Sequence, residues 1–427
     1  MRVWPPVCAG LWFPPPHDTI NYRMTDRHHA RPNRPVYLDN QATTRCDPRV
    51  VEAMLPWFAE QYGNPASAEH VMGRVAETAV ETARAHVAAI LGADTREIVF
   101  TSGATESNNI AIKGAARHAL KFGTDRRRIV TVATEHKCVL EAVADLADEG
   151  FEPVILPVRP DGLLDPDTLR RALETPTLLV SIMAVNNETG VIQDIPGLSA
   201  IAKAAGAIFH SDLAQAAGKI PLDLTGWGVD LASVSGHKIY GPKGIGALFV
   251  RRRPRVRVMP LFSGGGQERG LRSGTLATPL IAGLGEACRI ALHEMETDNA
   301  RIGFLRGNLL DQLASHIPGI SINGTMGHRI AGNLNITFPV ETAARMLERM
   351  PDLCVSTGSA CSSAEIEPSY VLRAMGLSDA EAARTLRIGI GRFTSPADID
   401  YAAATLAAAH QGPPKGGKHA ADHLAGA

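Results

Sequence analysis

The chain has 427 residues, of which 45% are hydrophobic, so it can bury a large core and is expected to form more than one domain. Its 43 basic and 44 acidic residues nearly cancel, which argues against an extended nucleic-acid surface and favours small-molecule chemistry. No apolar run is long enough to span a membrane, and the six cysteines form no CxxC pair, which argues against zinc ribbons and disulfide scaffolds. We therefore expect a cytoplasmic protein with reduced thiols that binds neither membrane nor nucleic acid.

Both ends of the chain have a composition that cannot pack a core. Residues 1–34 are rich in proline, arginine and histidine, and residues 411–427 are rich in glycine and proline. We expect a disordered N-terminal extension and a disordered tail. Either Met24 is the true start or the extension is an organellar transit peptide, and the first reading is preferred.

Between the ends, short β-branched runs alternate with longer Ala-rich amphipathic segments. The expected strands are 98–101, 129–133, 151–156, 178–184, 207–210, 231–234 and 247–250. Alternation at this spacing predicts an α/β fold with a mostly parallel seven-stranded sheet covered by helices, and it places ligands at the carboxyl ends of the strands.

The pattern changes after about residue 290. Helices there alternate with strands expected at 333–338 and 385–390, which predicts a smaller α+β domain. We expect the small domain to comprise 35–50 and 291–410, and the large domain to comprise 51–290.

Two strand ends carry residues suited to one cofactor. Lys238 follows the strand 231–234, and a lysine amine there can form a Schiff base with a carbonyl compound such as pyridoxal phosphate (PLP). Asp212 follows another strand, with Gln215 one turn beyond, and PLP needs an anion beside its pyridine nitrogen. Taken alone, Lys238 is as readily explained as a solvated surface lysine.

Further polar residues follow three other strands. The glycine turn after the strand 98–101 leads into a helix whose first N–H groups and Thr105 hydroxyl suit a phosphate, although Ser102 or Thr105 acting as an ordinary N-cap explains the same pattern. His136 is placed to stack on the cofactor ring and move protons, or else it is structural. Asn186 and Asn187 end a fourth strand in amides, which suit a polar ligand.

Taken in chain order, these motifs resemble the cysteine desulfurases, a branch of the class V aminotransferase-like, fold-type I PLP enzymes. The resemblance runs from about residue 36 to residue 410. The matching segments are 37–44 (YLDNQATT), 101–109 (TSGATESNN), 134–137 (TEHK), 185–190 (VNNETG), 210–215 (HSDLAQ), 235–238 (SGHK), 272–275 (RSGT) and 356–363 (STGSACSS). The last segment is similar to that of the group that serves iron–sulfur cluster assembly.

The resemblance implies that PLP is bound through Lys238, that Asp212 pairs with the pyridine nitrogen and that Gln215 meets the phenolic oxygen. His136 and Asn187 are expected beside the ring. The phosphate is expected to be held by Ala104, Thr105, Ser235 and His237, and by Thr275 of a second subunit. A site shared in this way implies a homodimer.

The resemblance also implies the reaction. Arg387 is expected to clamp the carboxylate of L-cysteine beside Asn187, with Arg392 as the fallback. Cys361, as a thiolate, is expected to take the substrate sulfur as a persulfide while L-alanine leaves, and His136 is the expected proton donor and acceptor. No resident metal is expected, although Cys361 is a candidate for transient contact with a nascent iron–sulfur cluster.

Alternatives remain at this point. A selenocysteine lyase or an aminotransferase of the same family would not need Cys361 to accept sulfur, Cys361 alone is also consistent with an ordinary buried thiol, and a noncatalytic subunit would keep only the fold. The expected sulfur acceptor is an iron–sulfur scaffold protein or another carrier. The C-terminal segment departs from the longer tail with which bacterial relatives bind the scaffold, so the resemblance implies the chemistry but does not extend to that binding segment.

Overall fold

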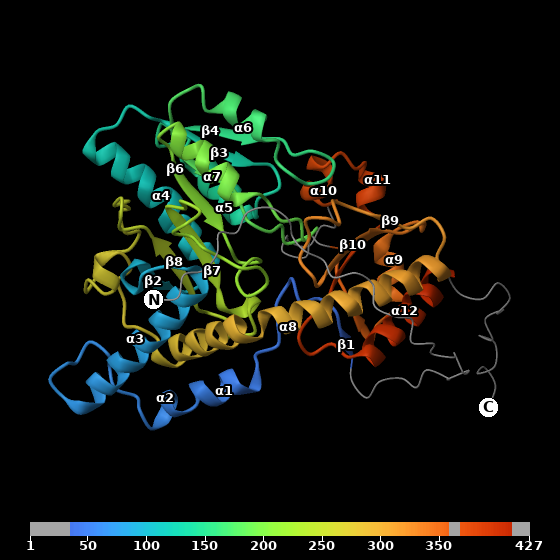
Figure 1. Ribbon diagram of the computed structural model, residues 1–427, viewed down its shortest axis with the longest axis horizontal. Helices are drawn as coiled ribbons and strands as arrows, with labels where there is room; N and C mark the ends of the chain where they lie inside the picture. The colour runs from blue at the N-terminus through green and yellow to red at the C-terminus, as the bar shows by residue number, and fades with distance from the viewer. Residues whose placement is uncertain (1–34, 358–367, 412–427) are drawn as a thin grey trace, which may run out of the picture. The chain divides into compact units, whose positions relative to one another are not determined.

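The computed structural model describes residues 35–357 and 368–411 (Figure 1). The α-helices in these ranges are α1 (Pro48–Met54), α2 (Pro56–Ala59), α3 (Val71–Leu91), α4 (Ala104–Phe122), α5 (Lys137–Asp145), α6 (Pro166–Ala172), α7 (Ile195–Ala204), α8 (Thr278–His316), α9 (Ala343–Glu348), α10 (Tyr370–Ala374), α11 (Asp379–Ala382) and α12 (Pro396–Gln411). The strands are β1 (Val36–Tyr37), β2 (Ile98–Thr101), β3 (Arg128–Val132), β4 (Glu152–Leu156), β5 (Thr177–Ser181), β6 (Ile208–Asp212), β7 (Leu231–Ser235), β8 (Gly246–Val250), β9 (Ser321–Ile322), β10 (Asn333–Thr337), β11 (Leu353–Cys354) and β12 (Thr385–Gly389). Short 3-10 turns are η1 (Thr95–Glu97), η2 (Gly236–Lys238) and η3 (Glu268–Gly270).

Seven strands form the largest sheet, in the order β2-β8-β7-β6-β5-β3-β4. Only β8 runs antiparallel to its neighbours β2 and β7, and the other adjacent pairs are parallel. These are the seven strands expected from the sequence, with ends that differ by three residues at most. The predicted mostly parallel sheet is therefore confirmed.

Helices cover both faces of this sheet, and the alternation along each strand assigns side chains to two hydrophobic cores. In β2, Ile98 and Phe100 pack in a core with α3, α7 and α8, whereas Val99 packs in a second core with α4 and α5. Every residue of β2, β5, β7 and β8 is buried. Strands buried on both faces read as continuous apolar runs, which is why the sequence pattern located them.

Helix starts have local causes in the sequence. Asp47, Asp165 and Asp194 are N-caps whose carboxylates accept from backbone N–H groups of the first turn, and each helix has a proline in that turn. The carboxylate satisfies an otherwise unbonded N–H, and proline costs nothing there because its missing N–H would have had no helical partner.

A second, three-stranded antiparallel sheet has the order β12-β10-β9 and packs against α9, α12 and the end of α8. The short strands β1 and β11 pair in parallel beside it. The pattern located β10 and β12 but missed β1, β9 and β11, because two residues are too few to show a period.

Helix α8 is one continuous element of 39 residues. Its first half packs in the core beneath the large sheet through residues such as Leu284 and Ile290, and its second half packs in the core of the small sheet through Leu305 and Leu309. The helix runs straight across the domain boundary expected near residue 290 (Figure 1). The division into a large and a small domain stays a prediction.

Candidate active site

A cavity of about 1010 Å³ lies where the carboxyl ends of the parallel strands meet. Ten of the residues expected from the sequence line it, and they are Ala104, Thr105, His136, Asn187, Asp212, Gln215, Ser235, His237, Lys238 and Arg387. Thr275 and Arg392 do not line it, and Cys361 lies outside the described residues. Elements distant in sequence thus bring one set of reactive side chains together.

Lys238 ends the short turn η2 that follows β7. Its Nζ donates to the backbone oxygens of Gln41 (2.6 Å) and Ala42 (2.7 Å). The loop that supplies these oxygens is itself held in place, because the N–H and the hydroxyl of Thr44 both donate to the backbone oxygen of His237, at 2.9 Å in each case. The amine is therefore held at the cavity wall by acceptors that a covalent partner can replace.

Asp212 is the last residue of β6 and is only 5% exposed. Its carboxylate accepts from the Nδ2 of Asn108 (2.7 Å) and from the backbone N–H of Ala214 (2.8 Å). Two N–H donors stabilise a buried negative charge. A carboxylate prepared in this way can accept a hydrogen bond from a protonated ring nitrogen.

The start of α4 presents its first backbone N–H groups without a side-chain cap. The N-cap is Gly103, whose φ of 152° and ψ of −179° are essentially restricted to glycine. Neither Ser102 nor Thr105 caps the helix, so the ordinary N-cap explanation of this segment is not what the structure shows. Open N–H groups at a helix start favour an anion, and Ser235 and His237 line the same cavity.

His237 is held neutral at this position. Burial, followed by the positive charges of Lys238, Lys243 and Lys219, lowers the pKa of His237 to about 4. Its Nδ1 lies 3.0 Å from the hydroxyl of Thr43. A neutral imidazole can donate a hydrogen bond to a phosphate without placing a second positive charge next to Lys238.

His136 is the N-cap of α5, and its Nδ1 accepts from the backbone N–H of Cys138 (3.2 Å). The same nitrogen lies 3.0 Å from the thiol of Cys138. An accepting Nδ1 places the proton of the neutral ring on Nε2, so local structure selects the tautomer of a cavity histidine.

Arg387 rather than Arg392 reaches the cavity. Its Nη2 donates to Asp39 (2.9 Å) and its Nη1 to the backbone oxygen of Asn187 (3.1 Å), while its buried Nε has no acceptor among the described residues. Arg392 instead pairs with Asp298 (2.7 Å) and Asp47 (3.0 Å), which ties α8 to the N-terminal segment. The guanidinium of Arg392 is therefore occupied away from the cavity, and the substrate clamp stays a prediction that the geometry favours for Arg387.

Thr275 lies beside a separate cavity of about 230 Å³, which Asn64 and Ala66 also line. The preceding loop is anchored by a buried ion pair. The Nη1 and Nη2 of Arg84 donate to the two carboxylate oxygens of Glu268, at 2.8 Å in each case. Within one chain, Thr275 thus stays outside the main cavity.

The structure adds two buried carboxyls that the sequence reasoning missed. Glu135 and Glu188 are at most 2% exposed, and burial raises the pKa of both groups, that of Glu135 most strongly with a further contribution from Asp212. Glu188 accepts from the hydroxyl of Ser369 (2.6 Å), and Tyr370 donates to the backbone oxygen of Glu135 (2.7 Å). The sequence signal that could have identified Glu135 and Glu188 as site residues was their position directly next to His136 and Asn187.

No helix within residues 35–357 and 368–411 combines the length and the apolar character needed to cross a membrane.

Comparison with known proteins identifies relatives along nearly the whole described chain. Residues 36–402 match the family model described as aminotransferase class-V. The chain is 53% identical to "Cysteine desulfurase IscS" of Rickettsia felis (strain ATCC VR-1525 / URRWXCal2), over 87% of this chain and 90% of that protein. It is 54% identical to the protein of the same name from Rickettsia akari (strain Hartford), over 86% and 89% of the two chains.

Solved structures agree with the sequence relatives. A "NifS-like protein" superposes with a TM-score of 0.81 at 37% identity and covers 88% of this chain and 98% of its own. DndA from Streptomyces lividans has a TM-score of 0.71 at 42% identity, over 83% and 99% of the two chains. These neighbours support the α/β class and the type of fold that the motifs predicted.

Proposed function

Because the chain belongs to the cysteine desulfurases of the class-V aminotransferase family, we propose that the cavity described above binds PLP and L-cysteine and passes the substrate sulfur to Cys361. The observation that carries the proposal is the convergence of Lys238, Asp212, His136 and Arg387 on one cavity from four separate elements. These residues supply an amine, an anion, a proton carrier and a carboxylate clamp, which the reaction requires in addition to the thiol that accepts the sulfur.

The residues present fit PLP. Lys238 supplies the amine for the covalent link, Asp212 the acceptor for the ring nitrogen, and the open start of α4 with Ser235 and His237 a phosphate site. The buried Oδ1 of Asn187 lacks a hydrogen-bond donor among the described residues, as expected of a group that meets a polar ligand. When bound, PLP supplies a ring that accepts the electron pair from the substrate α-carbon.

The substrate is held and oriented by the protein. Arg387 offers guanidinium N–H groups to the carboxylate of L-cysteine, and the unused Nε gives it a donor to spare. His136 takes and returns protons through Nε2 near the substrate sulfur, because its Nδ1 is engaged with the backbone. The C–S bond of the substrate breaks, its electron pair remains on carbon, and the carbon is protonated to give L-alanine.

The sulfur forms a new S–S bond with the thiolate of Cys361, which lies outside the described residues. From that persulfide the sulfur passes to an iron–sulfur scaffold protein or another acceptor, and we place this activity in the cytoplasm. The persulfide also separates the proposal from a selenocysteine lyase or an aminotransferase, because those reactions do not need a protein thiol to accept sulfur.

Intact-mass analysis after incubation with L-cysteine tests the proposal. We expect a reducible adduct of one sulfur atom that maps to Cys361. The Cys361→Ser variant should keep the absorption band of bound PLP but lose both sulfide and alanine production. Alanine released by Cys361→Ser at the parental rate, or an adduct confined to other cysteines, would contradict the assignment of the nucleophile.

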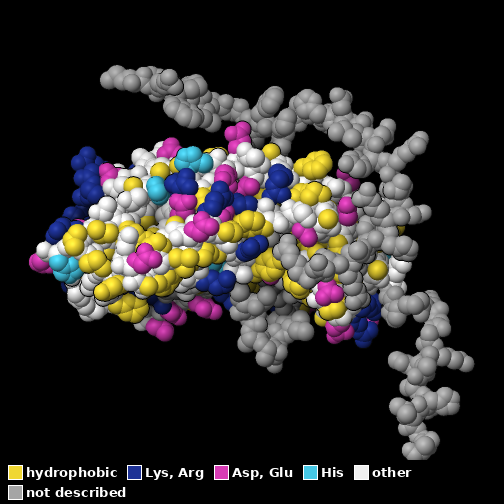
Figure 2. All heavy atoms as spheres, turned by 90° about the horizontal axis from the view of Figure 1, so that it is seen from below, with side chains coloured by type: hydrophobic (Ala, Val, Ile, Leu, Met, Phe, Trp, Pro, Cys, Tyr) yellow, Lys and Arg dark blue, Asp and Glu magenta, His cyan; other side chains and the backbone are white. Residues whose placement is uncertain are grey.

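A homodimer with a shared site completes the proposal. The face formed by α1, α2 and the start of α3 exposes large apolar side chains, including Leu55 (59%), Phe58 (60%) and Tyr62 (72%). Figure 2 is viewed from the side on which α1 and α2 lie in Figure 1, and it shows hydrophobic side chains gathered across that face. Thr275 lines its cavity with Asn64 and Ala66, which lie between α2 and α3, so we propose that a second copy buries this face and receives Thr275 at its phosphate site.

Sedimentation or light scattering tests the dimer. We expect a parental mass of two chains and a Phe58→Glu variant that dissociates. A dimer that persists in Phe58→Glu would show that this face is not the interface.

A further inference from the structure

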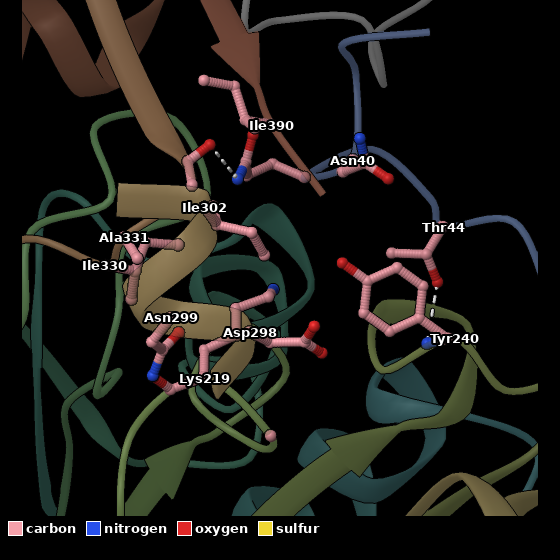
Figure 3. A pocket seen from close by; sticks show the side chains of 13 residues that line it. Asn40, Thr44, Lys219, Tyr240, Asp298, Asn299, Ile302, Ile330, Ala331 and Ile390 are labelled. Carbon is pink, nitrogen blue, oxygen red and sulfur yellow. Dashed lines mark hydrogen bonds between the residues drawn. The ribbon is translucent and has the colours of Figure 1, made fainter. Parts of the chain in front are cut away.

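Lys219 is a partly buried lysine that the proposed reaction does not use. It follows β6 by a short loop and lines a small cavity of about 30 Å³ behind the active site, together with Gln41, Asp298 and Asn299. Figure 3 shows Lys219 beside Asp298 and Asn299 of α8. The backbone oxygen of Lys219 accepts from the side-chain amide of Asn299 (2.8 Å), so α8 fixes the position of the residue.

Hydrogen bonds connect this amine to the reactive lysine. The Nζ of Lys219 donates to the Oε1 of Gln215 (2.6 Å), and the Nε2 of Gln215 donates to the backbone oxygen of Gln41 (2.8 Å). That same oxygen accepts from the Nζ of Lys238 (2.6 Å). Gln215 is 2% exposed and lines the main cavity, so it lies between the two amines.

The two partners of Gln215 select one orientation of its amide. Lys219 can donate in either charge state, and the backbone oxygen of Gln41 can only accept, so a flipped amide would place its own oxygen against the oxygen of Gln41. In the observed orientation the Nε2 group uses one hydrogen on Gln41 and retains a second. Without Lys219, the buried Oε1 of Gln215 would lose this hydrogen-bond donor, at the free-energy cost typical of an unsatisfied buried polar group.

We propose that Lys219 is a positioning residue, which holds the Gln215 amide with its remaining N–H toward the cavity and thereby sets the pH at which bound PLP changes its protonation. The inference rests on the proposed function. A donor aimed at the phenolic oxygen favours the oxygen anion, and a lost or reversed donor favours retention of the proton.

The charges around Lys219 determine how it acts. The charged groups that face it are Lys238 on η2, Arg387 on β12 and Asp298 on α8. Burial, followed by the positive charges of Lys238 and Arg387, lowers the pKa of Lys219 to about 7. Above that pH the amine is mostly neutral and still donates a hydrogen bond, so it works there through Gln215 rather than through its charge.

Titration of the visible absorption band of the holoenzyme above pH 7 tests the proposal. We expect Lys219→Met to bind PLP and to shift the midpoint of the titration upward by about one pH unit, since a hydrogen bond to the charged form is lost. Lys219→Arg retains a donor and should restore most of the parental midpoint. Lys113→Met is the matched control, because Lys113 is also a partly buried lysine with a hydrogen-bonded amine, here bonded to Asp145, but lies outside the cavity.

A second measurement keeps the test decisive if Lys219→Met is unstable. Gln215→Leu should shift the midpoint in the same direction, and Lys219→Arg should have no further effect in that background. A midpoint that Lys219→Met leaves at the parental pH, with only thermal stability lowered, would overturn the inference and leave the proposed function standing. A parent protein with no absorption band and no borohydride-reducible adduct on Lys238 would overturn both.

Discussion

Replacement of Arg387 by lysine separates the substrate clamp from the general positive charge of the cavity. Lysine keeps the charge but offers a compact ammonium in place of the planar fork of donors. In the structure the fork spans Asp39 (2.9 Å) and the backbone oxygen of Asn187 (3.1 Å), with Nε still available. Loss of two charge-assisted hydrogen bonds between the guanidinium and the carboxylate of L-cysteine, at about 1.5 kcal/mol each, removes about 3 kcal/mol of binding free energy. At about 1.4 kcal/mol per factor of ten, kcat/KM for L-cysteine should fall about 100-fold.

L-Alanine formation across a range of L-cysteine concentrations measures this effect. The loss in Arg387→Lys should fall mainly on KM, and the PLP absorption band should remain, because the clamp binds substrate rather than cofactor. Arg392→Lys is the control, since its guanidinium bonds Asp298 and Asp47 away from the cavity, and its KM should stay within about twofold of the parent. An unchanged KM in Arg387→Lys, or an equal rise in Arg392→Lys, would refute the assignment of the clamp.

Three further predictions concern buried polar groups. Glu268→Gln removes the buried one of the two carboxylates that pair with the guanidinium of Arg84, leaving only the exposed Glu81, and should lower the free energy of unfolding by about 3 kcal/mol, measured by urea denaturation, whereas a loss below about 1 kcal/mol would contradict the buried pair. Burial lowers the pKa of His210 to about 3, so the unfolded chain binds a proton that the folded chain does not, and stability should fall as pH drops from about 6.5 toward 4. His210→Gln should flatten that dependence in thermal melts, and an equally steep curve would argue against it. Asn108→Leu removes a donor from Asp212 and should weaken PLP binding about tenfold in equilibrium dialysis, with unaltered affinity as the contrary result.

Sequence patterns located those parts of the fold that depend on local order. Strands such as β5 and β7 are buried throughout and centre on small or β-branched apolar residues, so their existence followed from composition and spacing. The strand-end positions of Lys238 and Asp212 followed in the same way, because a polar residue after an apolar run marks the edge where ligands bind.

The remaining features depend on contacts that sequence spacing does not encode. Lys219 is one lysine among many until the fold places Gln215 and α8 around it. Arg387 and Arg392 lie five residues apart in the segment 386–392 (LRIGIGR), and only the second lies beyond the end of β12 at Gly389, where it pairs with Asp298. The pairing of β1 with β11 joins segments more than 300 residues apart and leaves no local period.

The length of α8 has a consequence for how the molecule melts. Because the single helix α8 packs in both hydrophobic cores, unfolding of either core would disrupt helical turns that stabilise the other core. Heat or denaturant should therefore unfold residues 35–357 and 368–411 in a single cooperative step, and a helix-breaking substitution at an exposed position midway along α8, such as Glu296→Pro, should destabilise both cores at once.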